Sequence, residues 1–520
     1  MWRLLLLFKK KRLFTLLKTL VYVTSLTALA SKSNAIEFSE VIINSPYKLT
    51  QEIIAADVLA SKGKELLTFS VDEQSNRWLI IYQLNHDTNQ YVVAEKTIIP
   101  KQFYRFDLSE QKSDKKDIKQ KLYFLSADSL TFYQNKQFTS LASIESLYIQ
   151  EQADFLSRGN FIQDLNNDAF ADVIIADFNN THILIGQEKG GFVSQVLPIK
   201  PEVRVFSSGA SYTQAKLYFN DVNFDDKTDI LLVGDGEMII YAQIEQSLFA
   251  PTAIHLPINE AISGTEWWNK RDESGEQLDQ SDLEYRKLEE LRDVNADGIV
   301  DMVVRYTKAS GVLDRVNDYE IFLGHNNKGE LSYAQQPDSV IHAEGTLTGL
   351  EFVDIDNDDK LEVLLAGFDI GLSQIIGALI TGGIDQDVYV FKMNAQDKFP
   401  AKPTIQKEVE LTFSLSSGQS GSAVVKLADL NGDGLKELIL SDDDELKIYL
   451  GKTASKSKKS SKHNKSFKKR SLSYSTQLPK DGNLVMVEDL NGDGKDDLLM
   501  KFSRLDGEDK AKEFKVLFSK

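Results

Sequence analysis

The residues best suited to chemistry are oxygen-bearing side chains that recur with one spacing in six short segments. The clearest segment spans 429–442 and has these side chains at its positions 1, 3, 5 and 9, which are Asp429, Asn431, Asp433 and Glu437. Position 7 can add a backbone carbonyl, and the glycines at positions 4 and 6 allow a tight curl because glycine accepts positive φ. Hard oxygen ligands that converge on one point suit Ca²⁺. The spacing therefore predicts a calcium loop.

Five other segments have the same pattern. Their residues are Asp164, Asn166, Asp168 and Asp172; Asp221, Asn223, Asp225 and Asp229; Asp293, Asn295, Asp297 and Asp301; Asp354, Asp356, Asp358 and Glu362; and Asp489, Asn491, Asp493 and Asp497. Ordinary turn chemistry is the alternative, because Asp, Asn and Gly are common in turns. Six copies in one phase favour metal binding, with about six Ca²⁺ sites in the chain.

Position 12 separates these loops from an EF-hand, which needs a bidentate Glu there. The residues found at position 12 are Ile175, Leu232, Val304, Leu365, Leu440 and Met500. The loops are followed by short apolar runs, such as 173–176 and 230–233. Such runs are typical of strands buried on both faces. Each loop is therefore predicted to join two strands of a β-hairpin.

The loop and its apolar strand resemble the FG-GAP repeat of the integrin α-subunit N-terminal β-propeller, and more closely the VCBS repeat of bacteria. A second element agrees, since 183–186, 321–324 and 448–451 each end an apolar run on a glycine. The resemblance covers about residues 160–520, although the literal Phe-Gly and Gly-Ala-Pro signatures are absent. It implies a calcium-binding propeller and fixes neither a ligand nor a reaction.

The spacing of the loops predicts an all-β fold of four-stranded blades. Two degenerate loops at Asp57 and Asp107 lack the ligand spacing, so no metal is expected there. With them the chain has eight units, and four-stranded units repeated in this way are the signature of a propeller. The last unit lacks a fourth strand, which the segment Phe38–Ile43 can supply to close the ring. We expect eight blades, with seven as the alternative.

Residues 1–35 have the features of a signal peptide. A basic start precedes an apolar stretch of 12 residues, Thr19–Ala30, and Ser33-Asn34-Ala35 offers a cleavage site. Twelve residues are too few to cross a bilayer, although an uncleaved anchor is an alternative. We therefore expect a single propeller domain over 36–520, with no transmembrane span after signal removal, in the periplasm, on the outer surface or secreted. The chain has no cysteine, which excludes disulfides.

Three insertions exceed the repeat. Residues 258–290 hold Trp267 and Trp268 and a charged run from Asp279 to Arg292 that is predicted to be helical. Residues 370–386 are apolar and glycine-rich, and are interpreted as a short buried helix or a partner surface. Residues 452–470 are rich in Lys and Ser and are interpreted as a solvated loop. Exposed Trp can stack on sugars or anchor a protein, but packing of the insertion onto the propeller is the plainer interpretation.

The net charge and the absence of known catalytic motifs exclude several classes of function. The net charge of −18 argues against nucleic-acid binding. The sequence contains no HExxH, GxSxG, Walker A or GxGxxG motif, so no catalytic residue is assigned. We therefore favour an exported binding or adhesion scaffold for a glycan or protein partner at the cell envelope or outside. A calcium-dependent polysaccharide lyase or other glycan-active enzyme, and a structural component of an envelope assembly, are the alternatives.

Hairpin turns of a blade alternate between the two faces of the ring. The calcium loops join first and second strands, so the insertions 258–290 and 370–386 should both lie on the other face. Because binding residues concentrate on loops held by a rigid scaffold, we expect the partner on that face, with Trp267 and Trp268 as candidates.

Overall fold

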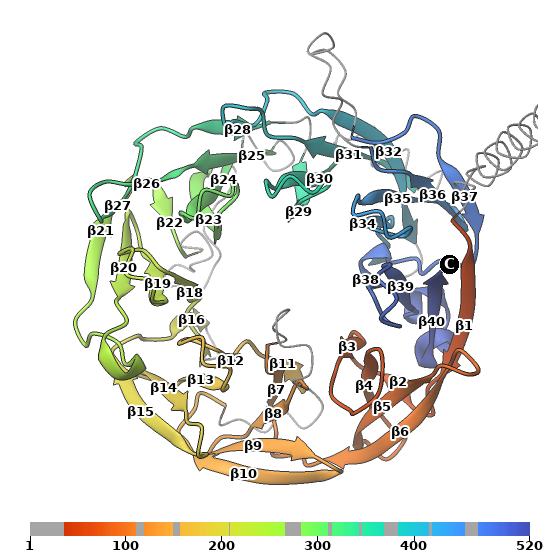
Figure 1. Ribbon diagram of the computed structural model, residues 1–520, viewed down its shortest axis with the longest axis horizontal. Coiled ribbons are helices and arrows are strands. Elements are labelled where there is room, and N and C mark those ends of the chain that lie inside the picture. Colours follow the sequence, from red (N-terminus) through yellow and green to blue (C-terminus); the bar gives the residue numbers. More distant parts are fainter. Residues whose placement is uncertain are drawn as a thin grey trace, which may run out of the picture.

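The computed structural model describes residues 36–110, 119–148, 156–206, 209–265, 282–309, 315–342, 346–368, 383–414, 419–452 and 466–520. These residues form eight β-sheet blades around a central opening (Figure 1). Among them there is no α-helix, only the short 3₁₀ helices η2 (Glu245–Ser247), η4 (Gly482–Leu484), η5 (Arg504–Asp506) and η6 (Glu508–Lys512). The predicted all-β propeller with eight blades is confirmed.

The first four blades follow one another along the chain. Blade 1 contains β2 (Lys48–Leu49), β3 (Ile54–Ala56), β4 (Glu65–Val71), β5 (Arg77–Asn85) and β6 (Gln90–Ile99), and blade 2 contains β7 (Arg105–Leu108), β8 (Leu122–Leu125), β9 (Ser129–Gln134), β10 (Gln137–Ser143) and β11 (Ser157–Arg158). Blade 3 contains β12 (Ile162–Gln163), β13 (Asp172–Ala176), β14 (Thr181–Gly186) and β15 (Phe192–Leu197), and blade 4 contains β18 (Tyr218–Asn220), β19 (Asp229–Val233), β20 (Glu237–Tyr241) and β21 (Ile254–Pro257). Between blades 3 and 4 the chain forms a separate hairpin of β16 (Glu202–Phe206) and β17 (Gly209–Thr213).

The other four blades complete the ring. Blade 5 contains β22 (Ile262–Ser263), β23 (Glu284–Arg292), β24 (Asp301–Ala309), β25 (Arg315–Phe322) and β28 (Ser339–Ile341), with a small hairpin of β26 (Gly324–Asn326) and β27 (Leu331–Tyr333) inserted. Blade 6 contains β29 (Thr346–Val353), β30 (Glu362–Phe368), β31 (Gly383–Phe391), β32 (Ile405–Ser414) and β33 (Gln419–Ser420). Blade 7 contains β34 (Val425–Ala428), β35 (Glu437–Asp442), β36 (Glu445–Tyr449) and β37 (Leu472–Ser475), and blade 8 contains β38 (Val485–Glu488), β39 (Asp497–Lys501) and β40 (Glu513–Ser519).

The N-terminal strand closes the ring as predicted. β1 (Phe38–Asn44) pairs antiparallel with β40, with Phe38 opposite Ser519 and Asn44 opposite Glu513. It is therefore the outermost strand of blade 8, next to blade 1 (Figure 1). A main-chain hydrogen bond from Lys64 N to Leu490 O, 2.8 Å long, adds an inner contact between the first and last blades.

The core is divided among the interfaces between blades. One apolar cluster lies between each pair of neighbouring blades. Alternate side chains of a strand pack into the clusters on its two sides. In β13, Ile174 packs toward blade 4 whereas Val173 and Ile175 pack toward blade 2. Both faces of the strand are thus buried, which explains why its sequence is a continuous apolar run.

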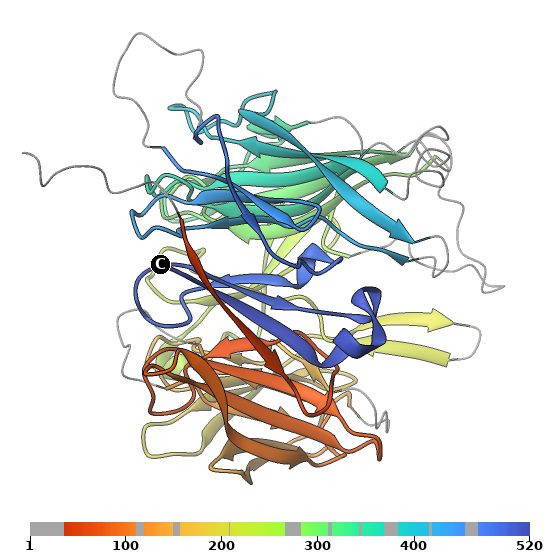
Figure 2. The ribbon, with the colours of Figure 1, turned by 90° about the vertical axis from the view of Figure 1, so that its right-hand side faces the viewer.

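The turns divide between two faces of the ring. We call the face that carries the six acidic loops the loop face and the opposite one the far face. The carboxylate of Asp497 at a loop accepts a hydrogen bond from Ser519 N, so the C-terminal end lies on the loop face. The hairpin β16–β17 projects from the far face (Figure 2).

The structure corrects part of the expectation for the insertions. The charged run before Arg292 is not helical, because Glu284–Arg292 forms β23 with every third residue buried. Likewise Gly383–Gln386, at the end of the 370–386 insertion, belongs to β31 and pairs with β32. The segments 266–281, with Trp267 and Trp268, 369–382 and 453–465 lie outside the described residues, as does 1–35.

The strands that flank the first two insertions begin or end on the far face, as predicted. Glu284 pairs with Lys308, at the opposite end of blade 5 from the loop that follows Arg292. Gly367 pairs with Asp387, at the opposite end of β30 from the loop that precedes Glu362. No helix among the described residues is long and apolar enough to cross a membrane.

Closure by β1 gives a testable contrast between two neighbouring residues. Val41 is 3% exposed and packs between blades 8 and 1, whereas Ile42 is 52% exposed. We expect Val41→Ala to lower the free energy of unfolding by about 2 kcal/mol through a cavity, and Ile42→Ala to change it by less than about 0.5 kcal/mol. Urea denaturation of both variants measures this, and equal effects would contradict closure by this strand.

Candidate metal-binding loops

All six acidic loops share one backbone conformation, which the carboxylate at position 1 holds. Its two oxygens accept hydrogen bonds from the N–H groups of positions 5 and 6; in the loop of blade 7, Asp429 accepts from Asp433 at 3.1 Å and from Gly434 at 2.8 Å. Equivalent pairs of bonds are made by Asp164, Asp221, Asp293, Asp354 and Asp489. Positions 4 and 6 have positive φ in every copy, although both are glycine only in the last two loops.

The carboxylate at position 9 ties each loop to its blade. In blade 3, Asp172 Oδ2 accepts from Leu165 N and Oδ1 accepts from Gly186 N, at the end of the third strand, both at 2.8 Å. The same pair of bonds is made by Asp229, Asp301, Glu437 and Asp497. All these carboxylates are 0% exposed, so each loop buries a negative charge.

Burial shifts the protonation of these groups. It raises the pKa of Asp172, Asp301, Asp497 and Glu437 to about 7, and that of Asp229 to about 6, with the neighbouring carboxylates at positions 1 and 5 adding to the rise. Backbone hydrogen bonds oppose the shift without cancelling it. Like charges close together favour neutralisation by a proton or by a cation. The loops are therefore electrostatically prepared for a positive ion.

The asparagine at position 3 lies close to the carboxylates of its loop and donates to them through its amide nitrogen. In the loops of blades 3, 5 and 8, the amide of the Asn at position 3 lies 2.9–3.2 Å from a carboxylate oxygen at position 5. In blade 7 the amide of Asn431 lies 3.0 Å from Glu437 Oε1. Three carboxylates and one amide are a hard oxygen donor set, which suits Ca²⁺. The residues of the five loops with Asn at position 3 thus fit a calcium ion.

Neighbouring loops are connected through their backbones. The N–H of position 8 donates to a carbonyl at the start of the preceding loop: Leu361 to Val294 and Lys436 to Ile355, both at 3.0 Å, and Asp496 to Asp429 at 2.9 Å. Lys64 continues this series to Leu490 across the seam of the ring. The loops of blades 5 to 8 and the degenerate loop of blade 1 therefore form one connected inner rim.

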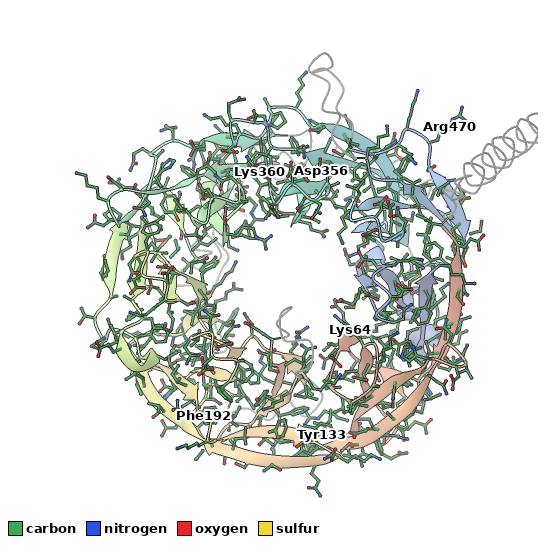
Figure 3. The ribbon with its side chains drawn as sticks, viewed as in Figure 1. Lys64, Tyr133, Phe192, Asp356, Lys360 and Arg470 are labelled. Carbon is green, nitrogen blue, oxygen red and sulfur yellow. The ribbon has the colours of Figure 1, made fainter. Side chains whose placement is uncertain are left out.

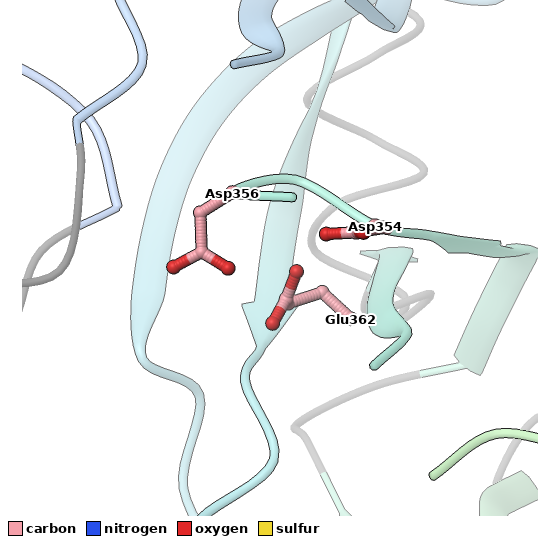
Figure 4. Close-up of side chains that lie close together, drawn as sticks. All are labelled: Asp354, Asp356 and Glu362. Atoms are coloured by element: carbon pink, nitrogen blue, oxygen red, sulfur yellow. The ribbon is translucent and has the colours of Figure 1, made fainter. Parts of the chain in front are cut away.

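The fourth loop differs from the other five. Asp354, Asp356 and Glu362 converge, with one oxygen of each within 4.8 Å of the others (Figure 4). Asp356 lies toward the inner rim of blade 6 (Figure 3). In this loop an ammonium group bridges two predicted ligand positions, because Lys392 Nζ lies 2.7 Å from Asp356 Oδ1 and 2.9 Å from Glu362 Oε1. In the loop of blade 4, Lys227 pairs with the position 5 carboxylate of Asp225. The residues of this loop therefore do not fit a calcium ion while the lysine is in place.

Each of the two degenerate loops retains a buried carboxylate that accepts backbone hydrogen bonds. At blade 1, Glu65 is 1% exposed and accepts from Val58 N and Leu59 N, both at 2.9 Å. At blade 2, Asp107 is a buried residue of β7 whose Oδ2 accepts from Phe161 N and Ile162 N. In the loop of blade 1, Leu59 occupies position 3, so the set of oxygen-bearing side chains is incomplete.

Two features escaped the sequence analysis. The hairpin β16–β17 exposes Val203, Val205, Phe206 and Tyr212 on the far face; its signal was the alternation of Val203 and Val205 before a Ser-Ser-Gly turn. The other feature is Lys392, whose signal was the aspartate at position 3 of its loop, where every other loop has asparagine.

The comparison with protein families supports the repeat assignment. Residues 429–500 match the family described as the FG-GAP-like repeat. The matched segment includes the acidic loops of blades 7 and 8. The resemblance to FG-GAP repeats is thereby confirmed, and the chain is an eight-bladed propeller that contains an FG-GAP-like repeat. No curated protein matched the chain.

Solved structures show distant similarity. A lectin from Agrocybe aegerita, described by its specific recognition of non-reducing terminal N-acetylglucosamine, has a TM-score of 0.37 at 14% identity, covering 73% of this chain and 83% of the lectin. BBS1N in complex with ARL6DN has a TM-score of 0.34 at 9% identity, covering 92% and 96%. The WD40 domain of SCAP from fission yeast has a TM-score of 0.30 at 10% identity, covering 79% and 95%. Similarity this distant carries no argument about what the chain binds.

The raised pKa values predict how the calcium-free protein responds to pH. The position 9 carboxyls of Asp172, Asp301 and Asp497 have a folded pKa of about 7, above the ordinary value near 4, so their contribution to stability is full below about pH 4 and is lost as the pH rises through 7. We expect the melting temperature of chelator-treated protein to fall between about pH 5 and 8, and added Ca²⁺ to remove the decline. A flat profile without Ca²⁺ would contradict the buried-charge interpretation.

Proposed function

We propose that the protein is an exported, calcium-binding propeller that serves as an interaction scaffold for a glycan or protein partner. The observation that carries this proposal is the repeated loop, in which a buried carboxylate and three further oxygen-bearing groups occur together on one face of the ring. The sequence of residues 1–35 supports export, to the periplasm, the outer surface or the medium.

Calcium has a structural role in this proposal. The ion would neutralise the position 9 carboxylate, held by two backbone N–H groups, together with the carboxylates of positions 1 and 5. Because these loops join the first two strands of a blade, and those of blades 5 to 8 contact a neighbouring loop, a bound ion would strengthen the blade and, in that part of the ring, the inner rim. Extracellular calcium modules commonly have dissociation constants of about 10⁻⁴–10⁻³ M.

The far face is the proposed binding face. It carries the hairpin β16–β17 and the flanks of the insertions 258–290, which holds Trp267 and Trp268, and 370–386. On this hairpin Val205 is 69% exposed, and Tyr212 packs edge-to-face against Phe178, with ring centroids 4.9 Å apart. Exposed apolar and aromatic side chains on a rigid scaffold commonly mark interaction sites.

Calcium binding is tested by stoichiometry and stability together. We expect calorimetry to show Ca²⁺ uptake at the asparagine-containing loops, and chelation to lower the melting temperature because a ligand of the native state stabilises it. Asp433→Ala should lose one ion and weaken one blade without abolishing folding. Glu188→Ala, which removes an exposed carboxylate of a turn on the same face, is the matched control. Absence of uptake, with no effect of chelator on melting, would refute the proposal.

The binding face is tested by replacing both tryptophans. We expect Trp267→Ala/Trp268→Ala to weaken capture of a partner on a glycan array or from an envelope extract at least tenfold, while calcium stoichiometry stays unchanged. A hairpin variant, Val205→Ser/Phe206→Ser, separates the contribution of β16 from that of the insertion. Binding retained in both variants would exclude the far-face proposal.

A further inference from the structure

The loop of blade 6 has a charge that the other loops lack. It places Asp356 at position 3, where the other five have asparagine, and so contains four carboxylates instead of three. Asp356 and Glu362 are both largely shielded from solvent, with side chains 6% and 1% exposed. Buried like charges at this separation are strongly unfavourable without a compensating cation.

Lys392 provides that compensation within the chain. Its Nζ lies 2.7 and 2.8 Å from the two oxygens of Asp356, 2.9 Å from Glu362 Oε1 and 3.1 Å from Asp358 Oδ2. The ammonium group thus contacts the residues of positions 3, 5 and 9, which are three of the four that would bind an ion. Three carboxylates within hydrogen-bond distance favour the charged form of this lysine.

The strand register shows that this lysine is specific to blade 6. Val363 pairs with Phe391, so the next residue, Lys392, lies across from Glu362. The registers of the other five blades place apolar residues at the equivalent point, and these are Ile185, Ala242, Leu323, Leu450 and Phe518. The extra carboxylate and the lysine therefore occur together in one blade and are both absent from the other five.

We propose that the ammonium group of Lys392 is a tethered cation that takes the place of Ca²⁺ in the loop of blade 6. The propeller then has five calcium sites and one site neutralised by its own side chain. This inference deepens the proposed function and rests on it, because it assumes that the asparagine-containing loops bind Ca²⁺.

A second lysine makes a related contact in blade 1. Lys119 Nζ lies 2.7 Å from Asp57 Oδ1 and 3.4 Å from Ser61 O, at positions 1 and 5 of the degenerate loop. Lys119 comes from the connection between β7 and β8 of blade 2, so this ion pair also joins two blades. In blades 1 and 6, whose loops have no asparagine at position 3, a lysine from outside the loop thus contacts a carboxylate of the loop.

The experiment counts bound ions in the full mature protein and in Lys392→Met. We expect five Ca²⁺ in the wild type and six in Lys392→Met by calorimetry on chelator-treated protein. Lys392→Met should also melt at a lower temperature in chelator and recover more on addition of Ca²⁺ than the wild type. Lys360→Met is the matched control: Lys360 belongs to the same loop but pairs with Asp397, so the count should remain five.

The outcomes separate the inference from the proposed function. Six ions in the wild type, or five in Lys392→Met, would overturn the inference and leave calcium binding intact. No ions in either protein would refute the proposed function itself. Should Lys392→Met fail to fold, Asp356→Asn/Lys392→Met gives the loop the residue types of the other five at positions 1, 3 and 5, and the same gain of one ion is expected.

Discussion

The buried carboxylate at position 9 is the interaction on which each acidic loop depends. It accepts one backbone N–H from the start of its own loop and, in five of the six loops, one from the end of the third strand. It therefore fixes the loop to the first three strands of the blade. Glu65 keeps part of this role in blade 1, where the other ligand positions are lost. The carboxylate thus has a structural function that is separate from any metal.

Burial of that carboxylate has an electrostatic free-energy cost, which the other groups of the loop either lower or raise. Hydrogen bonds from two N–H groups reduce the cost of the buried charge, but the neighbouring carboxylates of positions 1 and 5 increase it, and the pKa remains raised. A nearby cation would offset the repulsion between these carboxylates. In the loop of blade 6 the cation is Lys392, and the additional carboxylate of Asp356 gives it a partner. The composition of the blade 6 loop is consequently matched to its lysine.

Much of the fold could be predicted because its signals are local and repeated. The loop spacing identifies the first turn of a blade, and the apolar runs identify strands whose side chains pack into two interfaces. The missing last strand predicts closure of the ring by Phe38–Ile43. The segment that forms β23 was predicted to be helical because its charged residues have a high local helix propensity. Its pairing with β24, a contact between separate segments, makes it a strand instead. Lys392 was missed because it lies 30 residues beyond Glu362 in sequence and meets it only through strand register.

The connected inner rim explains where the chain tolerates extra residues. The acidic loops of blades 5 to 8 donate to or accept from a neighbouring loop, so lengthening a first-to-second turn there would break these contacts. The long first-to-second connection occurs in blade 2, which lacks the acidic spacing, and the insertion of blade 7 follows β36, in the outer half of its blade (Figure 1). The far face has no equivalent series of contacts among the described loops, and the hairpin β16–β17 and the flanks of two insertions lie there. The contacts of the inner rim therefore constrain the length of the loops on the loop face, whereas the hairpin β16–β17 and the flanks of two insertions extend the far face.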